Sequence, residues 1–343
     1  MLWPARFWIF SRPLLAFGLS FAAACVPVPA SDDFGTASFT LPGGASTPGA
    51  QGGESWTAVT APSLPSSLAG GSPISKPTGL MWKATLAKNT VYLLGSLHAA
   101  SPELYPLPKP IEAAFLRSSV LLVEVDINRI TSAQTSKLMS SYALYDSGDS
   151  LWNHVSSETK KVIESIWCRT GASCDAVAKL RPWALALVGS RQPTGMSAAL
   201  GIDRYFLDRA EGHIRIGEME SADAQLKMFA DLPDSQQEAF LMDSIRGAQL
   251  ERQYLLELQA AWLSGDARRM ETLMNWAFRD TAAMEQTVLG DRNLHMADVV
   301  EQCLRNGQRA FAVMGAFHLL GNDGVIRLLQ DRGYRVEQVL PAN

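Results

Sequence analysis

Hydrophobic positions from residue 79 onward follow two alternating patterns. Short apolar runs with the length of buried strands predict β-strands at 80–87, 90–94, 120–126, 213–220, 309–314 and 334–340. Apolar positions at helical spacing predict helices over 108–117, 202–211, 291–305 and 321–332, and several more within 132–190 and 233–278. This order favours an α/β fold, in which a mixed central sheet is flanked by helices and carries a large helical insertion.

The first 30 residues are organised differently. Arg6 and Arg12 precede an apolar stretch that is shorter than the roughly 20 residues needed to span a bilayer, so residues 1–30 read as a secretory signal. We therefore expect an exported protein of the bacterial periplasm. Cys25 follows three alanines, as in lipoprotein signals, so the chain is either anchored to a membrane by a lipid on Cys25 or cleaved after Ala30. No other membrane attachment is expected.

Residues 31–78 are rich in Gly, Ser, Pro and Thr. Such a segment cannot bury enough apolar surface to offset the entropy of ordering, which predicts a disordered linker. Residues 79–343 then form one folded domain. The chain is 47% hydrophobic with a net charge of −4, a composition that suits a globular protein and gives no support to a nucleic-acid partner.

The four cysteines indicate whether the chain can form a disulfide in an oxidising compartment and whether it can bind zinc through thiolates. Cys168 and Cys174 lie where a helix end and a loop precede a second helix, and they are close enough to pair in an oxidising compartment. Cys303 lies within a predicted helix and is interpreted as a small core residue. The sequence has no Cys-x-x-Cys pair, Gly-x-Ser-x-Gly elbow, Walker loop or Gly-x-Gly-x-x-Gly fingerprint. It therefore offers nothing to a thiolate zinc site, a serine hydrolase, an ATPase or a dinucleotide enzyme.

One short motif occurs twice, near opposite ends of the domain. Gly95-Ser96-Leu97-His98 and Gly315-Ala316-Phe317-His318 each follow an apolar run. Glycine after a strand permits a sharp turn with close backbone approach, and ligands collect at the carboxyl ends of strands in open α/β sheets. A single histidine in this position is more often structural. The recurrence favours a shared functional role for His98 and His318.

Two acidic residues lie near the ends of other predicted strands. Glu124 is flanked by apolar residues and needs a partner if it is buried, and Glu220 ends the run at 213–220. If the strands pair in the expected order, the two imidazoles and one or two of these carboxylates converge; Glu220 suits a surface position equally well. Imidazole and carboxylate groups can bind a divalent metal ion, for which manganese, cobalt and zinc are candidates, or act as a metal-free acid–base pair that activates water. Either arrangement leads to hydrolysis.

Other polar residues have plainer interpretations. Arg292 can hold a carboxylate or an anionic substrate group, or remain a solvated charge at a helix start. Asp203 is expected to be a cap or a first-turn acid of a helix. His154, His213 and His295 are expected in ordinary surface or packing positions.

These motifs together resemble the TraB/GumN family, which is related to the Tiki metalloproteases. The resemblance rests on both Gly-x-x-His blocks and on Leu122–Asp126, Gly201–Asp203, Gly217–Ser221 with Gln225, and Arg292–Asn293, in order across residues 80–343. It implies an α/β fold similar to the erythromycin esterase and ChaN-like group. It also implies a metal-dependent site containing His98, His318 and Glu124, with Glu220 and Arg292 as second candidates. Phe317 departs from the family pattern, which has a small residue before the second histidine, and this implies a narrower pocket or a different substrate.

We therefore expect an exported, metal-dependent hydrolase of the peptidase kind that acts on a peptide or another small amide or ester. The alternative is a non-catalytic protein that binds a metal, haem or a peptide in the same pocket. A third hypothesis is a partner protein that regulates a pheromone or another signal.

Overall fold

The computed structural model of the chain describes residues 64, 77–168, 170–188, 195–247 and 250–340. The predicted secretory signal and nearly all of the predicted linker lie outside these residues. Across the described ranges, no helix combines the length and the apolar character needed to cross a bilayer.

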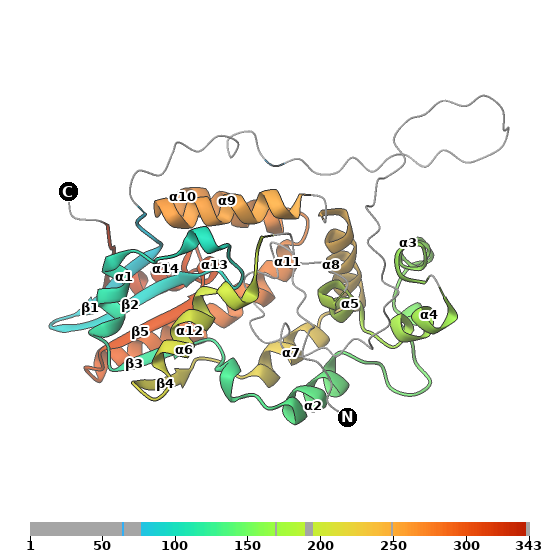
Figure 1. The fold of residues 1–343 in the computed structure, drawn as a ribbon, viewed down its shortest axis with the longest axis horizontal. Coiled ribbons are helices and arrows are strands. Elements are labelled where there is room, and N and C mark those ends of the chain that lie inside the picture. The colour runs from blue at the N-terminus through green and yellow to red at the C-terminus, as the bar shows by residue number, and fades with distance from the viewer. Residues whose placement is uncertain (1–63, 65–76, 169, 189–194, 248–249, 341–343) are drawn as a thin grey trace.

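The fold is built on a six-stranded sheet with the strand order β4-β3-β5-β2-β1-β6 (Figure 1). The strands are β1 Met81–Leu86, β2 Asn89–Ser96, β3 Val120–Val123, β4 Arg215–Glu218, β5 Ala310–Gly315 and β6 Arg335–Gln338. Strands β4, β3, β5 and β2 run parallel, whereas β1 is antiparallel to both β2 and β6. The predicted α/β class with a mixed sheet is therefore confirmed.

The strand sequences account for their places in the sheet. Every residue of β3 and β5 is buried, as expected for apolar parallel strands that are covered on both faces. β1 and β2, both predicted as strands, form a hairpin in which Leu86 pairs with Asn89 and Ala87 has a left-handed φ of 52°. The edge strand β4 is four residues long and has exposed ends.

Helices make up most of the remaining described chain. The α-helices are α1 Lys109–Leu116, α2 Ser132–Tyr142, α3 Ser157–Trp167, α4 Gly171–Ala178, α5 Pro182–Val188, α6 Ile202–Ala210, α7 Ala222–Ala230, α8 Asp234–Arg246, α9 Glu251–Ser264, α10 Ala267–Phe278, α11 Ala282–Glu285, α12 Asp291–Arg305, α13 Ala316–Leu319 and α14 Val325–Asp331. Single 3-10 turns cover Pro102–Leu104, Ile127–Arg129, Leu151–Asn153 and Ala198–Leu200, and a π-helical turn over Gln286–Gly290 joins α11 to α12. Helix α7 lies in a stretch for which the hydrophobic pattern predicts no element.

An aromatic cluster holds two helices against the sheet. Phe115 of α1 and Phe206 of α6 have ring centroids 5.0 Å apart, and both rings contact Phe311 of β5 at 5.7 and 4.9 Å. Aromatic pairs at such distances add to the stabilisation from apolar burial. In Figure 1, helices α2, α3, α4, α5, α7 and α8 gather to the right of the sheet. They come from the two long connections that follow β3 and β4, and they form the predicted helical insertion.

The region after β5 differs from the sequence prediction. The helix predicted at 321–332 begins only at Val325, because Gly321 has a φ of 79° and a Cβ at Gly324 would lie 2.2 Å from the carbonyl oxygen of Leu320. The four-residue helix α13, which was not predicted, follows β5 directly and carries His318.

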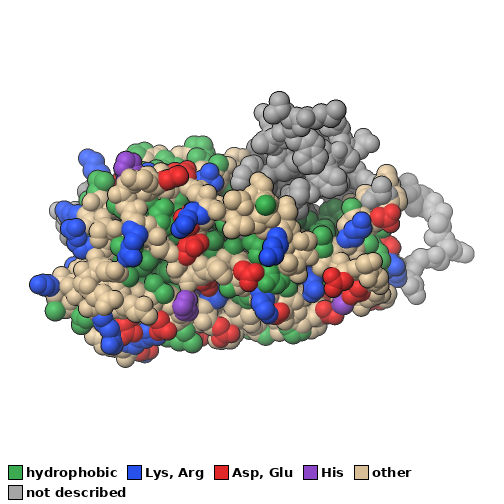
Figure 2. Space-filling model, turned by 90° about the horizontal axis from the view of Figure 1, so that it is seen from below, with side chains coloured by type: hydrophobic (Ala, Val, Ile, Leu, Met, Phe, Trp, Pro, Cys, Tyr) green, Lys and Arg blue, Asp and Glu red, His purple; other side chains and the backbone are tan. Residues whose placement is uncertain are grey.

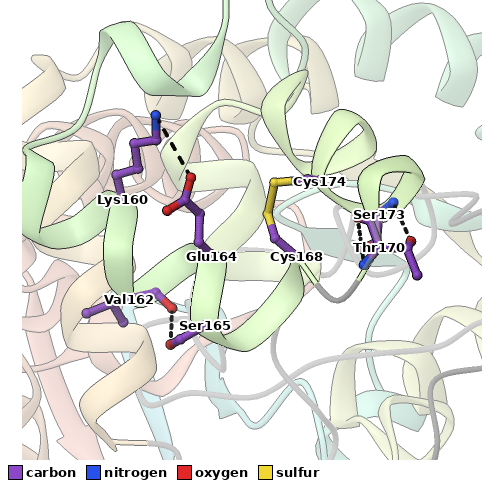
Figure 3. Close-up of a disulfide and its surroundings, with 8 residues drawn as sticks. All are labelled: Lys160, Val162, Glu164, Ser165, Cys168, Thr170, Ser173 and Cys174. Carbon is purple, nitrogen blue, oxygen red and sulfur yellow. Dashed lines mark hydrogen bonds and ion pairs between the residues drawn. A yellow bond between two sulfur atoms is a disulfide. The ribbon is translucent and has the colours of Figure 1, made fainter.

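The predicted cysteine pairing is confirmed. Cys168 at the end of α3 and Cys174 in α4 form a disulfide with their Cα atoms 4.4 Å apart (Figure 3). The bond ties together two short helices of the insertion. Cys303 is buried in α12, as predicted for a core residue.

Charges of both signs are mixed on the surface. On the face seen in Figure 2, Lys and Arg side chains are interspersed with Asp and Glu. Some of the described charges pair closely, for example Arg332 with Asp298 at 2.8 Å and with Glu301 at 2.7 Å. Exposed pairs of this kind each contribute at most about 1 kcal/mol, so the stability of the fold rests on its core and its buried polar contacts.

Candidate functional site

The carboxyl ends of the parallel strands bring the predicted residues together at one edge of the sheet. β2 and β5 are neighbours, with Ser96 opposite Gly315, so the two Gly-x-x-His segments lie side by side. β3 ends at Val123 rather than at 126, and Glu124 is the next residue. Beyond β4, the backbone N–H of Glu220 donates to the carbonyl of Glu124 at 2.9 Å, which keeps the two acids adjacent.

The first motif glycine lies at a close approach of the chain, and the second is tied to Glu124 by a backbone hydrogen bond. A Cβ at Gly95 would lie 3.1 Å from the Cα and the Cβ of Ala316, so a side chain there would push the two motif turns apart. The backbone N–H of Gly315 donates to Oε1 of Glu124 at 2.7 Å. Trp262 of α9 donates its indole N–H to the carbonyl of Gly95 at 2.6 Å, which anchors the first turn from the helical side. The motif therefore builds a tight junction of two strand ends.

The two imidazoles face the same carboxylate oxygen. Nε2 of His98 lies 4.0 Å and Nε2 of His318 lies 3.9 Å from Oε1 of Glu124. On the opposite side of each ring, Nδ1 of His98 is 2.6 Å from Oδ2 of Asp203, and Nδ1 of His318 is 2.6 Å from Oδ1 of Asn293. All five side chains are buried. The structure thus gives the two motif histidines matching environments as well as matching sequences.

Hydrogen bonds join the segment at the start of α6 to the loop that carries His98. The backbone N–H of Ile202 donates to the carbonyl of Leu97 at 2.9 Å, and Ala100 forms an isolated bridge with Ser197. A Cβ at Gly201 would lie 2.4 Å from the carbonyl oxygen of His98, so only glycine permits this approach. These contacts place the first turn of α6, and with it Asp203, beside the imidazole of His98.

A buried guanidinium joins the two glutamates. Arg292, in the first turn of α12, donates from Nε and Nη2 to both carboxylate oxygens of Glu220, at 2.7 and 2.6 Å, and from Nη2 to Oε2 of Glu124 at 2.8 Å. Its Nη1 donates to the carbonyl of Val288 in the π-helical turn at 2.8 Å. Gln225 of α7 donates to Oε2 of both acids, at 3.2 and 2.9 Å. Of the earlier alternatives for Arg292, the structure selects the one that holds a carboxylate.

Burial and charge act on the ionisation of this network in opposite directions. Burial raises the pKa of Glu124 above its usual range, and the charge of Arg292, with that of His98 when its ring is protonated, only partly offsets that effect. Burial also raises the pKa of Glu220, but the charge and hydrogen bonds of Arg292, with help from Gln225, outweigh it and leave the pKa below its usual value. Burial lowers the guanidinium pKa of Arg292, but the charges and hydrogen bonds of the two carboxylates raise it by more. The net effect is a raised pKa. The guanidinium is therefore the fixed charge of the site.

The charge balance and donor types of the site suit a divalent cation. Glu124, Glu220 and Asp203 as carboxylates and Arg292 as the one cation give a formal charge of −2 when both histidines are neutral. Imidazole nitrogen and carboxylate oxygen are the ligands that zinc, cobalt and manganese accept. The distances from each Nε2 to Oε1 of Glu124, 4.0 and 3.9 Å, are longer than in a metal-bound site, because two ligand atoms of one tetrahedral ion lie about 3.4 Å apart. Accordingly, no group of three or more His, Cys, Asp or Glu side chains among the described residues is spaced to hold a metal ion.

Three residues of the site were missed by the sequence interpretation. Asp203 is a first-turn acid of α6, as predicted, but its side chain binds His98, and the helix cap is Gly201. Asn293 and Gln225 had no assigned role. One signal could have found all three: each falls on the buried stripe of its helix, at three- and four-residue spacing from apolar positions. The stripes are 203, 206, 207 and 210 in α6, 222, 225, 226 and 229 in α7, and 293, 296, 297 and 300 in α12.

The remaining predicted residues lie outside the site. His213 and His295 are exposed, as predicted. His154 is half-buried and bridges Asp149 and Asp234, at 2.8 Å from each. The ring of Phe317 is fully buried 6.5 Å from that of Phe278 in α10, so the bulk that departs from the family pattern is packed in the core.

Comparison with known proteins agrees with the motifs. The "Uncharacterized protein YbaP" of Escherichia coli is 25% identical over 243 residues, which are 70% of this chain and 87% of that protein. The protein of the same name from Shigella flexneri matches to the same extent. No solved structure matches the chain. The family model described as "TraB/PrgY/gumN family" matches residues 80–338, a span that contains the whole sheet and every side chain of the site, and the chain belongs to that family.

Proposed function

We propose that this protein is a hydrolase that cleaves a peptide or another small amide or ester, with a divalent metal ion held by His98, His318 and Glu124. The observation that carries the proposal is the convergence of both Nε2 atoms, from 4.0 and 3.9 Å, on one oxygen of Glu124. Metal-binding histidines typically donate Nδ1–H to a carboxylate or carbonyl oxygen and present Nε2 to the ion. Both rings have such an acceptor here.

Each residue has a role that follows from its contacts. His98 and His318 present imidazole nitrogen, and Glu124 presents Oε1, which also accepts the backbone N–H of Gly315. Arg292, which Glu220 binds in turn, holds Glu124 by the opposite oxygen and so fixes its direction. When bound, a divalent ion supplies hydroxide at neutral pH, because it lowers the pKa of water to about 7. The formal charge of −2 on the buried groups supports a doubly charged partner.

Export is part of the proposal. The disulfide between Cys168 and Cys174 supports an oxidising compartment such as the periplasm. We propose that the protein either is free in the periplasm or is held at a bacterial membrane by a lipid on Cys25. In either form its partner is a small substrate rather than a nucleic acid.

Metal stoichiometry of the full chain is the first test. The protein is stripped with a chelator, refilled with manganese, cobalt or zinc, and assayed for bound metal beside the double variant His98→Ala, His318→Ala. The variant His213→Ala is the control, because it removes an exposed imidazole. We expect about one metal ion per chain in the wild type and in the control, and its loss in the site variant.

Turnover decides between an enzyme and a binding protein. The metal-loaded wild type is screened against mixtures of peptides, amides and esters, with the site variant as the blank. Cleavage that disappears in the site variant supports the hydrolase. Tight metal, haem or peptide binding without cleavage favours the alternative of a non-catalytic binding protein. Cleavage that persists in the site variant contradicts the proposed site.

A further inference from the structure

We propose that Asp203 and Asn293 are positioning residues that hold His98 and His318 in the tautomer with hydrogen on Nδ1, so that each Nε2 directs an electron pair at Glu124. The proposal about the tautomers stands on hydrogen-bond geometry alone. Its consequence, that both rings are ready to bind a metal ion, rests on the proposed function.

The amide of Asn293 can adopt only one orientation. Its Nδ2 donates to the backbone carbonyl of Asp323 at 2.8 Å, and a carbonyl cannot donate in return. Oδ1 must therefore be the atom that faces Nδ1 of His318 at 2.6 Å. An amide oxygen only accepts hydrogen bonds, so Nδ1 carries the hydrogen and the electron pair of the neutral ring lies on Nε2.

Asp203 has the same effect by different chemistry. Its carboxylate oxygen also only accepts, and it lies 2.6 Å from Nδ1 of His98. The side chain is 7% exposed, whereas an acid that merely complements a helix dipole normally faces solvent. The close approach of Gly201 to the carbonyl of His98 places the first turn of α6 where this bond can form. Asp203 thus orients an imidazole rather than capping its helix.

The two positioning residues are independent of each other. Asp203 comes from α6 and carries a charge, whereas Asn293 comes from α12 and is neutral. Their shared property is an acceptor oxygen 2.6 Å from Nδ1 of a motif histidine. Both residues therefore fix the direction of the imidazole ring and the position of its hydrogen. The charge of the accepting side chain is not what they share.

The tautomers can be read directly from the full chain. Nitrogen-15 NMR of the imidazoles at pH 8 distinguishes a protonated Nδ1 from a protonated Nε2, and single His→Gln variants assign the signals. We expect both His98 and His318 to show protonated Nδ1 and bare Nε2. In Asp203→Leu only the His98 signals should move toward a mixture of tautomers, and in Asn293→Leu only those of His318. The wild-type spectrum tests the proposal even if a variant fails to fold.

Metal affinity provides the second readout. Loss of a group that orients a metal-binding histidine costs about 10–100-fold in affinity, so cobalt binding should weaken by that factor in both variants. Asp208→Leu in α6 and Asn306→Leu at the C-cap of α12 are controls, because they make the same changes at exposed positions and should leave affinity unchanged.

The outcomes separate this proposal from the proposed function. A ring with protonated Nε2 in the wild type, or tautomers that stay unchanged in both leucine variants, overturns the positioning role. If the tautomers behave as expected but the wild type binds none of the three metals and cleaves no substrate, the positioning role stands and the metal-dependent hydrolase fails.

Discussion

Arg292→Met removes the single cation from a buried cluster of acids while keeping much of the side-chain length. The guanidinium makes two hydrogen bonds to Glu220 and one to Glu124, and the side chains of the three residues are 8%, 9% and 4% exposed. Removing one partner of a buried ion pair leaves an uncompensated charge and costs about 3–5 kcal/mol. We expect a loss of this size in the free energy of unfolding, measured by urea denaturation with far-UV circular dichroism.

A double-mutant cycle identifies the cause of the loss. Glu220→Gln removes the acid that Arg292 binds with two hydrogen bonds, so the double variant Arg292→Met, Glu220→Gln buries one charge fewer than Arg292→Met alone. We expect the double variant to lose less than the sum of the single variants by about 1–3 kcal/mol, the coupling typical of residues in one network. Arg305→Met is the control on the same helix. Its side chain is 67% exposed, and the change should cost no more than about 1 kcal/mol.

The pH dependence follows from the lowered pKa of Glu220. A carboxyl with a pKa lowered by folding adds stability above its usual pKa, and that contribution is lost as the pH falls through the folded value. The difference between the wild type and Arg292→Met should therefore be largest at neutral pH and should shrink below about pH 4.5. A cost under about 1 kcal/mol at pH 7, or strict additivity in the cycle, would refute the view of Arg292 as the electrostatic centre of the site.

Two further perturbations test other parts of the structure. Burial lowers the pKa of His154, but hydrogen bonds to Asp234 and Asp149 outweigh it and raise the pKa, so the histidine adds stability below about pH 6.5 that is lost as the pH rises through the folded value. Thermal melts should show His154→Gln less stable by about 1 kcal/mol at pH 5.5 and equal to the wild type near pH 9, and a constant difference would contradict the bridge. Gly201→Ala places a Cβ 2.4 Å from the carbonyl oxygen of His98, so it should lower the free energy of unfolding by about 1–3 kcal/mol and weaken cobalt binding. If stability and cobalt affinity both stay unchanged, the loop can move to accept the methyl group.

The sheet edge could be predicted because its information is local. Continuous apolar runs mark β3 and β5 as buried parallel strands, and a glycine near the end of β2 and of β5 marks where the chain leaves the sheet. Once the sheet is parallel at these strands, His98, His318 and Glu124 have to lie at one edge. The helical details after β5 were less accessible, because where α13 ends and α14 begins depends on the tight backbone turn at Gly321 and Gly324 rather than on apolar periodicity.

The partners of these residues could not be predicted from local patterns. His98 and Asp203 are 105 residues apart, and Glu124 and Arg292 are 168 residues apart, so no spacing rule connects them. An acid in the first turn of a helix has an ordinary explanation in the helix dipole, and this explanation concealed the role of Asp203. The position of Asp203 on the apolar stripe of α6 indicates a different role, because a buried polar residue requires a hydrogen-bond partner.

The contacts imply a division of labour between the sheet and the helices. The segments that follow β2, β3 and β5 supply the side chains that face one another, His98, Glu124 and His318. Among the described residues, helices α6, α7 and α12 supply the side chains that hydrogen-bond to them. A side chain at a strand end is free to rotate unless something behind it fixes its direction, and a site held loosely by about 1 Å loses most of its activity. Changes in the helices that leave the sheet residues intact should therefore be able to abolish function. By the same reasoning, a relative that keeps both Gly-x-x-His motifs but lacks acceptors at the positions of Asp203 and Asn293 should share the fold without the chemistry.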